Sequence, residues 1–233
     1  MSHKQMLVSI VIPLYNEGQT IGNVIERVQA TMNLMDLKYE IIVVDDHSCD
    51  DSLIVARRYP VRLYSLLVHV GKGMGLRTGF AKAIGNLVVT IDSDGSHLPE
   101  ELPKLLYPVL NGKADVVIGS RYLFQKKVDA KRLNAFGVRI FNLIIQMFVG
   151  VYVTDSQSGY RAMRREVIEV QHLKSFGYEI EAEMLVKTVK SGFRVFEVPI
   201  SFKQRVFGVS GVDYLRDVFK IFVSIVSARL RGV

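Results

Sequence analysis

The sequence predicts an α/β fold in which one mostly parallel sheet is flanked by helices. Short strand-like segments alternate with helix-like segments through the first half of the chain. Polar clusters follow four of these strands, at residues 15–17, 45–46, 92–94 and 120–121. Such alternation is typical of a parallel sheet with helices on both faces, and these sheets bind ligands at the carboxyl ends of their strands. We therefore expect a Rossmann-like sheet with a polar, ligand-binding edge.

The first half contains five predicted strands and four predicted helices. The strands are expected at 7–12, 40–46, 61–67, 86–91 and 115–119. The helices are expected at 18–32, 50–59, 73–84 and 99–110. In the first helix Ile21, Val24 and Val28 recur at helical spacing. Gly85 is expected to cap the third helix. The fourth begins with Pro99 and two glutamates, which is typical of a helix start.

The second half is less regular. Residues 126–139 hold five basic side chains and one acidic side chain, and a long helix through Phe148 is expected to follow. Residues 154–160 resemble a loop, 178–190 a helix and 193–199 a strand. The last predicted element is an apolar-rich helix at 214–230 with basic residues at its end.

Composition limits the possible classes of protein. The chain has 233 residues, 49% of them hydrophobic, which is enough for one large domain and tight for two. Cys49 is the only cysteine, which excludes an intrachain disulfide and a multi-cysteine zinc site. The longest apolar stretch, 140–153, is interrupted by Asn142 and Gln146 and is shorter than the roughly 20 residues of a membrane span. With no signal peptide in view, we expect a cytoplasmic protein without a transmembrane helix.

The formal net charge of +7 points to an anionic partner, such as a nucleotide or an acidic membrane surface. A modestly basic soluble protein is an equally good explanation of the charge alone. Two apolar segments, 136–149 and 218–230, have basic residues near them in sequence. Such segments can lie on an anionic membrane surface, or they can pack into the core or a homodimer interface.

Asp92-Ser93-Asp94 is the motif that most directly suggests chemistry. Two carboxylates that flank one residue after a buried strand can hold one divalent cation and a ribose hydroxyl, and Mg²⁺ or Mn²⁺ prefers such oxygen ligands. The metal would neutralise charge on a departing nucleoside diphosphate. Taken alone the motif is weak, because a solvated turn that caps the next helix has the same sequence.

Further motifs occur in order along the chain. Pro13-Leu14-Tyr15-Asn16-Glu17 follows the first predicted strand, and Asp45-Asp46-His47-Ser48 follows the second. After Asp92-Ser93-Asp94 come Gly119-Ser120-Arg121-Tyr122, the 155–161 segment Asp-Ser-Gln-Ser-Gly-Tyr-Arg, and Val198-Pro199-Ile200 with Arg205 and Gly208 behind it. Over roughly residues 7–211 this set resembles the family 2 glycosyltransferases with the GT-A fold, most of all their dolichyl-phosphate mannose synthase and glucosyltransferase branch.

The resemblance implies roles for the matching residues. Pro13, Tyr15 and Glu17 would line the base and ribose, and Asp46 would hydrogen-bond the base. Asp92 would contact ribose or sugar, and Asp94 the metal. Arginine binds phosphate bidentately, so Arg121, Arg132 and Arg205 would meet the diphosphate or a lipid phosphate. The catalytic candidates are Asp94, Arg121 and Arg205, and the metal candidates Asp92 and Asp94. The substrate-binding candidates are Pro13, Tyr15, Glu17, Val44, Asp46, Lys72, Asp92, Ser93, Arg132 and Glu183.

Several of these positions have simpler explanations. Pro13 can end a strand, the two aspartates at 45–46 can cap the next helix, and Arg132 can belong to a solvated basic face. The sequence also departs from the family pattern, since Ser96 stands where many mannose synthases carry Gln and Ala135 stands where a serine is frequent. These departures bear on the sugar, base and acceptor contacts more than on the class.

The expected protein is a single domain over 1–233, with a nucleotide-sugar half at about 1–120 and an acceptor half at about 121–233. Its expected reaction moves a hexose from GDP-mannose or a UDP-sugar, with inversion, to a polyprenyl or dolichyl phosphate at the cytoplasmic membrane face. A glycosyltransferase with another acceptor is one alternative. A sugar nucleotidyltransferase is another, although that class usually opens with a glycine-rich loop. A nucleic-acid-binding module would leave the strand-end carboxylates without a purpose, so no nucleic-acid partner is expected.

Overall fold

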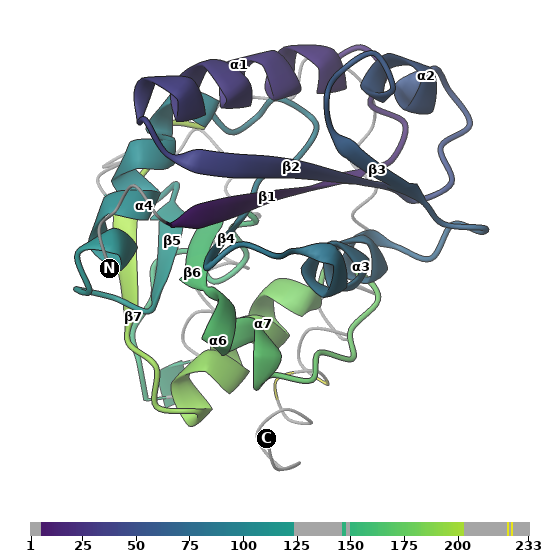
Figure 1. Cartoon of the computed structure of the whole chain (residues 1–233). Helices are drawn as coiled ribbons and strands as arrows, with labels where there is room; N and C mark the ends of the chain where they lie inside the picture. The colour runs from purple at the N-terminus through teal and green to yellow at the C-terminus, as the bar shows by residue number, and fades with distance from the viewer. Residues whose placement is uncertain (1–5, 124–145, 148–149, 203–222, 224, 226–233) are drawn as a thin grey trace.

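The computed structural model describes residues 6–123, 146–147, 150–202, 223 and 225. Its strands form one seven-stranded sheet in the order β3-β2-β1-β4-β6-β5-β7 (Figure 1). The strands are β1 (Leu7–Leu14), β2 (Lys38–Asp45), β3 (Arg62–Ser65), β4 (Leu87–Thr90), β5 (Val116–Ser120), β6 (Arg161–Arg164) and β7 (Val195–Pro199). The helices are α1 (Ile21–Leu34), α2 (Ser52–Ala56), α3 (Lys72–Lys82), the 3₁₀ turn η2 (Pro99–Glu101), α4 (Leu102–Leu110), α6 (Arg165–Glu169) and α7 (Ile180–Lys190).

The sheet is mostly parallel, as the sequence predicts. The central strand β1 pairs in parallel with β2 on one side and β4 on the other. β6 is antiparallel to both of its neighbours, β4 and β5. Because β6 lies between β4 and β5, the sheet interleaves strands from the two halves of the chain. The carboxyl ends of β1, β2 and β4 lie at one edge, where the polar motifs begin.

Helices cover both faces of the sheet. In Figure 1, α1 and α2 lie on one side of β1 and β2, and α3 and α7 lie on the other. Two buried apolar clusters correspond to these layers, because alternate residues of a strand point to opposite faces. Ile10 and Ile12 belong to the cluster with α1, whereas Val11 belongs to the cluster with α3 and α7. A Cβ at Gly79 of α3 would lie 2.3 Å from Cγ1 of Val11, so this glycine permits the close packing of α3 on β1.

Some boundaries differ from the prediction. β1 continues through Pro13, which pairs with Val44 of β2 beyond the end of the β1–β4 ladder, so its missing N–H costs no bond to β4. The prediction that Gly85 caps α3 is wrong, because the cap residue is Ala83. A Cβ at Gly85 would instead lie 2.7 Å from the carbonyl oxygen of Leu7, which explains the glycine by close packing.

Two elements have no counterpart in the prediction. β6 and α6 follow directly on each other at 161–169, where no strand or helix is expected from the sequence. The expected 50–59 helix is shorter, since α2 covers only Ser52–Ala56. The basic 126–139 stretch, the expected helix through Phe148 and the expected 214–230 helix fall outside the described residues, apart from isolated positions. Among the described residues, no helix combines the length and the apolar character that a bilayer crossing requires.

Candidate functional site

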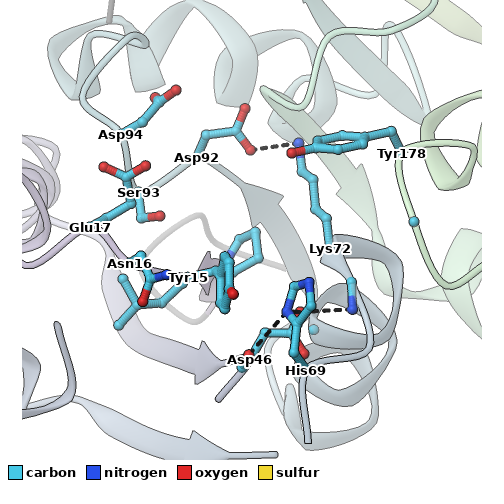
Figure 2. A pocket seen from close by; sticks show the side chains of 15 residues that line it. Tyr15, Asn16, Glu17, Asp46, His69, Lys72, Asp92, Ser93, Asp94 and Tyr178 are labelled. Atoms are coloured by element: carbon cyan, nitrogen blue, oxygen red, sulfur yellow. Dashed lines mark hydrogen bonds and ion pairs between the residues drawn. The ribbon is translucent and has the colours of Figure 1, made fainter. Parts of the chain in front are cut away.

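A cavity of about 450 Å³ opens at the carboxyl edge of the sheet, a size typical of small-molecule sites (Figure 2). It brings together the ends of β1, β2 and β4 with the start of α3 and the approach to α7. Its lining residues are Pro13, Leu14, Tyr15, Asn16, Glu17, Asp46, His69, Gly71, Lys72, Gly75, Asp92, Ser93, Asp94, Gly177 and Tyr178.

The loop after β1 is fixed by the loop after β2. The amide of Asn16 donates to Oγ of Ser48 at 2.9 Å, and the amide of Glu17 donates to Oγ of Ser52 at 2.6 Å. In return, Oδ1 of Asn16 accepts from the amide of Cys49 at 2.8 Å. Asn16 holds a φ of 52°, a left-handed conformation that asparagine tolerates better than most residues. These bonds position the Tyr15 and Glu17 side chains at the cavity.

Asp46 anchors the segment that leads into α3. Its Oδ1 accepts from the amide of Val70 at 2.8 Å, and its Oδ2 accepts from the amide of Gly71 at 2.7 Å. Nδ1 of His69 lies 2.9 Å from the same Oδ2. The His69 ring also stacks on the Tyr15 ring, with centroids 4.0 Å apart. The Asp46 carboxylate thus connects the end of β2 to residues 69–71, which line the cavity or adjoin it.

Lys72 lines the cavity and joins three parts of the chain. Its Nζ lies 2.6 Å from Oδ1 of Asp92 and 2.8 Å from Oε1 of Glu181. Burial by itself would lower the pKa of Lys72, but the charges of Asp92 and Glu181 outweigh it and hold that pKa above its ordinary value. The same pairing outweighs the effect of burial on Asp92 and lowers the pKa of its carboxyl. Lys72 is therefore a cation and Asp92 an anion at neutral pH.

His97 lies behind Asp92 in a buried position. Its ring is 2% exposed, and its Nδ1 is 3.6 Å from Oδ2 of Asp92. The rings of Tyr160 and Phe202 pack against it at centroid distances of 5.1 and 5.8 Å. Burial lowers the pKa of His97, so the neutral ring supports one side of Asp92 while Lys72 holds the other.

Asp94 lies on the turn beyond Asp92. Its Oδ1 accepts from the amide of Ser96 at 3.0 Å, and Gly95 between them holds a φ of 73°. Within the part of the chain that the structure describes, Oδ2 of Asp94 has no hydrogen-bond partner. The same described residues contain no group of three or more acidic, histidine or cysteine side chains arranged to hold a metal ion. Asp94 thus lines the cavity with one carboxylate oxygen that has no partner among the described residues.

Arg121 lies outside the residues that line the cavity. Its guanidinium is held by the fully buried carboxylate of Asp155, with Nε and Nη2 each 2.7 Å from one oxygen. The charge of Asp155 outweighs burial and raises the pKa of Arg121. The guanidinium carbon also lies 5.2 Å from the centroid of Phe202. Asp155 therefore fixes the orientation of Arg121, and the described residues supply no other hydrogen-bond partner for the guanidinium.

The acidic residue of α7 that reaches the cavity region is Glu181, not Glu183. Glu183 accepts from the amides of Lys174 and Ser175 and pairs with Nζ of Lys187 at 2.9 Å, so it stabilises the loop before α7. Residues two apart on a helix point about 200° apart, so only one of the two acids can face Lys72. The sequence shows both acids but not which of them lies on that face.

Other sequence-predicted residues fall into three groups. Tyr15, Glu17, Asp46, Lys72, Asp92, Ser93 and Asp94 line the cavity together with Pro13. Val44 does not, because its side chain is fully buried in the core cluster that contains Leu76. Arg132 and Arg205 fall outside the described residues. His69 and Tyr178 also line the cavity, but no sequence motif predicted them, because residues in loops follow no regular spacing.

Most of the chain matches one known protein family. The family described as Glycosyl transferase family 2 matches residues 9–171, which include most of β1, all of β2 through β6 and the strand-end carboxylates Asp46, Asp92 and Asp94. The chain belongs to glycosyltransferase family 2. This confirms the predicted family and identifies the chain as a glycosyltransferase.

Similar family 2 proteins include two that are named for lipid-phosphate mannosylation. A dolichol-phosphate mannosyltransferase of Pyrococcus furiosus is 32% identical over 231 residues, covering 93% of this chain and 64% of that protein. A polyprenol monophosphomannose synthase of Mycolicibacterium smegmatis is 32% identical over 236 residues, covering 91% of this chain and 84% of that protein. The chain thus spans a little under two thirds of the Pyrococcus relative.

A solved structure confirms the predicted GT-A glycosyltransferase fold. Glucosyl-3-phosphoglycerate synthase from Mycobacterium tuberculosis matches with a TM-score of 0.77 at 25% identity, covering 98% of this chain and 83% of that one. The same enzyme in complex with Mn²⁺, UDP and phosphoglyceric acid matches with a TM-score of 0.78 at 24% identity, covering 98% and 80% of the two chains.

Proposed function

We propose that this glycosyltransferase moves a hexose from a nucleotide-sugar, GDP-mannose or a UDP-sugar, to a polyprenyl or dolichyl phosphate with inversion at the anomeric carbon. The observation that carries the proposal is the gathering of Tyr15, Asp46, Asp92 and Asp94 around one cavity at the carboxyl edge of the sheet. The two relatives named for dolichol-phosphate and polyprenol-phosphate mannosylation support the choice of acceptor.

The donor is assigned along the cavity from base to sugar. Tyr15 offers an aromatic face and Asp46 a carboxylate, which together suit a nucleobase with N–H donors. In Figure 2 the side chains of Glu17 and Ser93 lie between Tyr15 and Asp94, where a ribose would bind. Asp92, held by Lys72, faces the ribose or the sugar.

A divalent cation, Mg²⁺ or Mn²⁺, fits the donor set at the aspartates. Mg²⁺ is commonly held by one or two carboxylates together with substrate phosphates, rather than by a full protein cage. Asp94 supplies the free carboxylate oxygen described above, while Asp92 is engaged by Lys72. When bound, the cation would neutralise charge on the diphosphate leaving group. The structures of the Mycobacterium tuberculosis enzyme with Mn²⁺ or Mg²⁺ and UDP support a metal in this role.

The acceptor needs little activation by the protein. A phosphate monoester is largely ionised near neutral pH, so its oxygen is already a nucleophile and no strong general base is required. The oriented guanidinium of Arg121 is suited to hold an anionic oxygen near Asp92, and Arg132 and Arg205 are further candidates by sequence. Positioning and electrostatic stabilisation would then supply most of the acceleration. A polyprenyl chain also requires access from a membrane, and the basic, apolar segments at 136–149 and 218–230 are the candidates for that contact.

A donor screen tests the proposal. The protein is incubated with Mg²⁺ or Mn²⁺, a short polyprenyl phosphate and a panel of GDP- and UDP-sugars, and release of nucleoside diphosphate is measured. We expect release from one donor that depends on the lipid phosphate and on the metal. Release that requires phosphoglycerate instead of the lipid would replace the acceptor, and release of pyrophosphate from a nucleoside triphosphate and a sugar phosphate would indicate a nucleotidyltransferase. Liposome binding that survives alanine substitutions in both apolar segments would refute the membrane contact.

A further inference from the structure

His69 lines the cavity beside Tyr15 and Asp46, the two residues proposed above to bind the base. The imidazole of His69 stacks on the ring of Tyr15, with centroids 4.0 Å apart and planes 25° apart. Nδ1 of the same imidazole lies 2.9 Å from Oδ2 of Asp46. In Figure 2 the His69 ring stands beside Tyr15, and a dashed line joins it to Asp46. A flat aromatic ring thus combines a stack on tyrosine with an N–H contact to a carboxylate.

Oδ2 of the Asp46 carboxylate is fully engaged while His69 holds this position. Its side chain is only 5% exposed, whereas that of His69 is 50% exposed. The backbone amides of Val70 and Gly71 take one oxygen each, and His69 takes a second position on Oδ2. A carboxylate offers about four acceptor positions, so with His69 as the third donor both positions on Oδ2 are taken and one remains on Oδ1. The two amides are fixed by the loop, which leaves His69 as the donor that can leave.

We propose that His69 occupies the place of the nucleobase when no donor is bound, and that the base displaces it from Tyr15 and Asp46. This inference rests on the proposed binding of a nucleotide-sugar. The imidazole makes the two contacts that a base with N–H donors would make there, an aromatic stack and a hydrogen bond to a carboxylate. A half-exposed side chain can rotate into solvent without disturbing the core. His69 then sets the affinity for the base, because binding must first break its two contacts.

If the base displaces His69, removing the His69 side chain should raise the affinity for the nucleotide. Removing a side chain that lines a binding site normally weakens binding, because contacts are lost. Removing a side chain that competes with the ligand strengthens binding, because a larger fraction of the protein is ready to bind. For His69→Ala we expect GDP or UDP to bind about three- to tenfold more tightly, which is the scale of one aromatic stack and one exposed hydrogen bond.

The test is calorimetric titration of the full chain with GDP and with UDP in the presence of Mg²⁺, for the wild type, His69→Ala and His69→Phe. The phenylalanine retains a ring against Tyr15 but has no N–H for Asp46, so its affinity should lie between the other two. Leu67→Ala is the matched control, since Leu67 lies in the same loop, is 92% exposed and should leave the affinity unchanged. Pyrophosphate with Mg²⁺ serves as a probe without a base and should bind all four proteins equally.

Three other results of the titration would contradict displacement of His69 by the base. Weaker or equal binding of both nucleotides by His69→Ala would overturn it and make His69 a permanent wall of the site. Tighter binding of pyrophosphate as well would also overturn it, because the effect would not lie at the base. Absence of nucleotide binding by every protein, with normal thermal unfolding, would refute the nucleotide-binding function itself, and the inference would fall with it.

Discussion

Replacing Gly159 with alanine tests whether the ion pair between Lys72 and Asp92 supports sugar transfer. A Cβ at position 159 would lie 2.6 Å from Nζ of Lys72 and 2.9 Å from both carboxylate oxygens of Asp92. The backbone there is held in place, because the carbonyl of Gly159 accepts a hydrogen bond from Oγ1 of Thr90 at 2.7 Å. The φ of Gly159 is outside the left-handed region, so alanine adds no backbone strain and acts through contact alone.

The size of the effect follows from these distances. Ordinary contact with a Cβ begins at 3.4 Å, so the lysine nitrogen must retreat by about 0.8 Å, the difference between 3.4 and 2.6. A pair that now meets at 2.6 Å would be stretched, and Asp92 would shift at the edge of the cavity. Overpacking of this kind costs about 1–3 kcal/mol of stability. Displacement of a positioning group by about 1 Å can cost up to about a hundredfold in rate, so we expect a loss of about ten- to a hundredfold.

The assay compares kcat/KM for nucleoside diphosphate release with the midpoint of thermal unfolding. Gly112→Ala is the control, because Gly112 has a φ of 66° with open space around it, at the far end of α4. Alanine there should cost about 1–2 kcal/mol through strain and leave transfer unchanged. Each kcal/mol corresponds to about 2–4 °C in a chain of this length. Full activity in a folded Gly159→Ala protein would show that the Lys72–Asp92 geometry is not needed for transfer.

The remaining predictions concern the other carboxylates. Asp94→Asn should lower transfer at least about a hundredfold. It should change the unfolding free energy without metal by less than about 0.5 kcal/mol, because the asparagine oxygen can still accept the hydrogen bond within the turn. Retained transfer would remove Asp94 from the metal site. Glu181→Gln should lower kcat/KM about tenfold or more. Glu183→Gln should instead cost about 1–2 kcal/mol of stability and leave kcat/KM unchanged. The reverse pattern would contradict the assignment of the two faces of α7. Finally, burial would raise the pKa of Glu183, but the hydrogen bonds that its carboxylate accepts from Ser175 and Lys187 outweigh burial and lower that pKa from 4.5. This stabilisation is complete above pH 4.5 and is lost as the pH falls toward the lowered pKa, so Glu183→Gln should flatten the acid branch of a stability–pH curve, and an unchanged curve would refute it.

The positions of the strand-end carboxylates were predictable from the sequence for a simple physical reason. Parallel strands that alternate with helices must bring their carboxyl ends to one edge, so residues 15–17, 45–46 and 92–94 had to meet once the strands were recognised. The cavity confirms that meeting. The Asp92-Ser93-Asp94 turn needs only local geometry, and the order of the motifs along the chain identified the family.

Other features depended on contacts that no local pattern encodes. β6 is only four residues long, Arg161–Arg164, and it exists because β4 and β5 offer it antiparallel partners on both sides. Glu181 and Glu183 have the same residue type and lie two positions apart, so only the rotation of α7 against the sheet decides which one meets Lys72. The role of Gly159 likewise depends on a lysine that lies 87 residues earlier in the chain.

Local sequence patterns were enough to predict the parallel strands, the polar edge of the sheet, the family and most of the acidic residues around the cavity, because periodicity and strand-end chemistry are local properties. The tertiary structure alone decided which partners those residues have. It paired Lys72 with Asp92, fixed Arg121 on Asp155 and placed His69 over Tyr15 and Asp46. Distances between side chains from different loops arise from the packing of the whole domain, and a charge or ring acquires its role only when that packing supplies its neighbours.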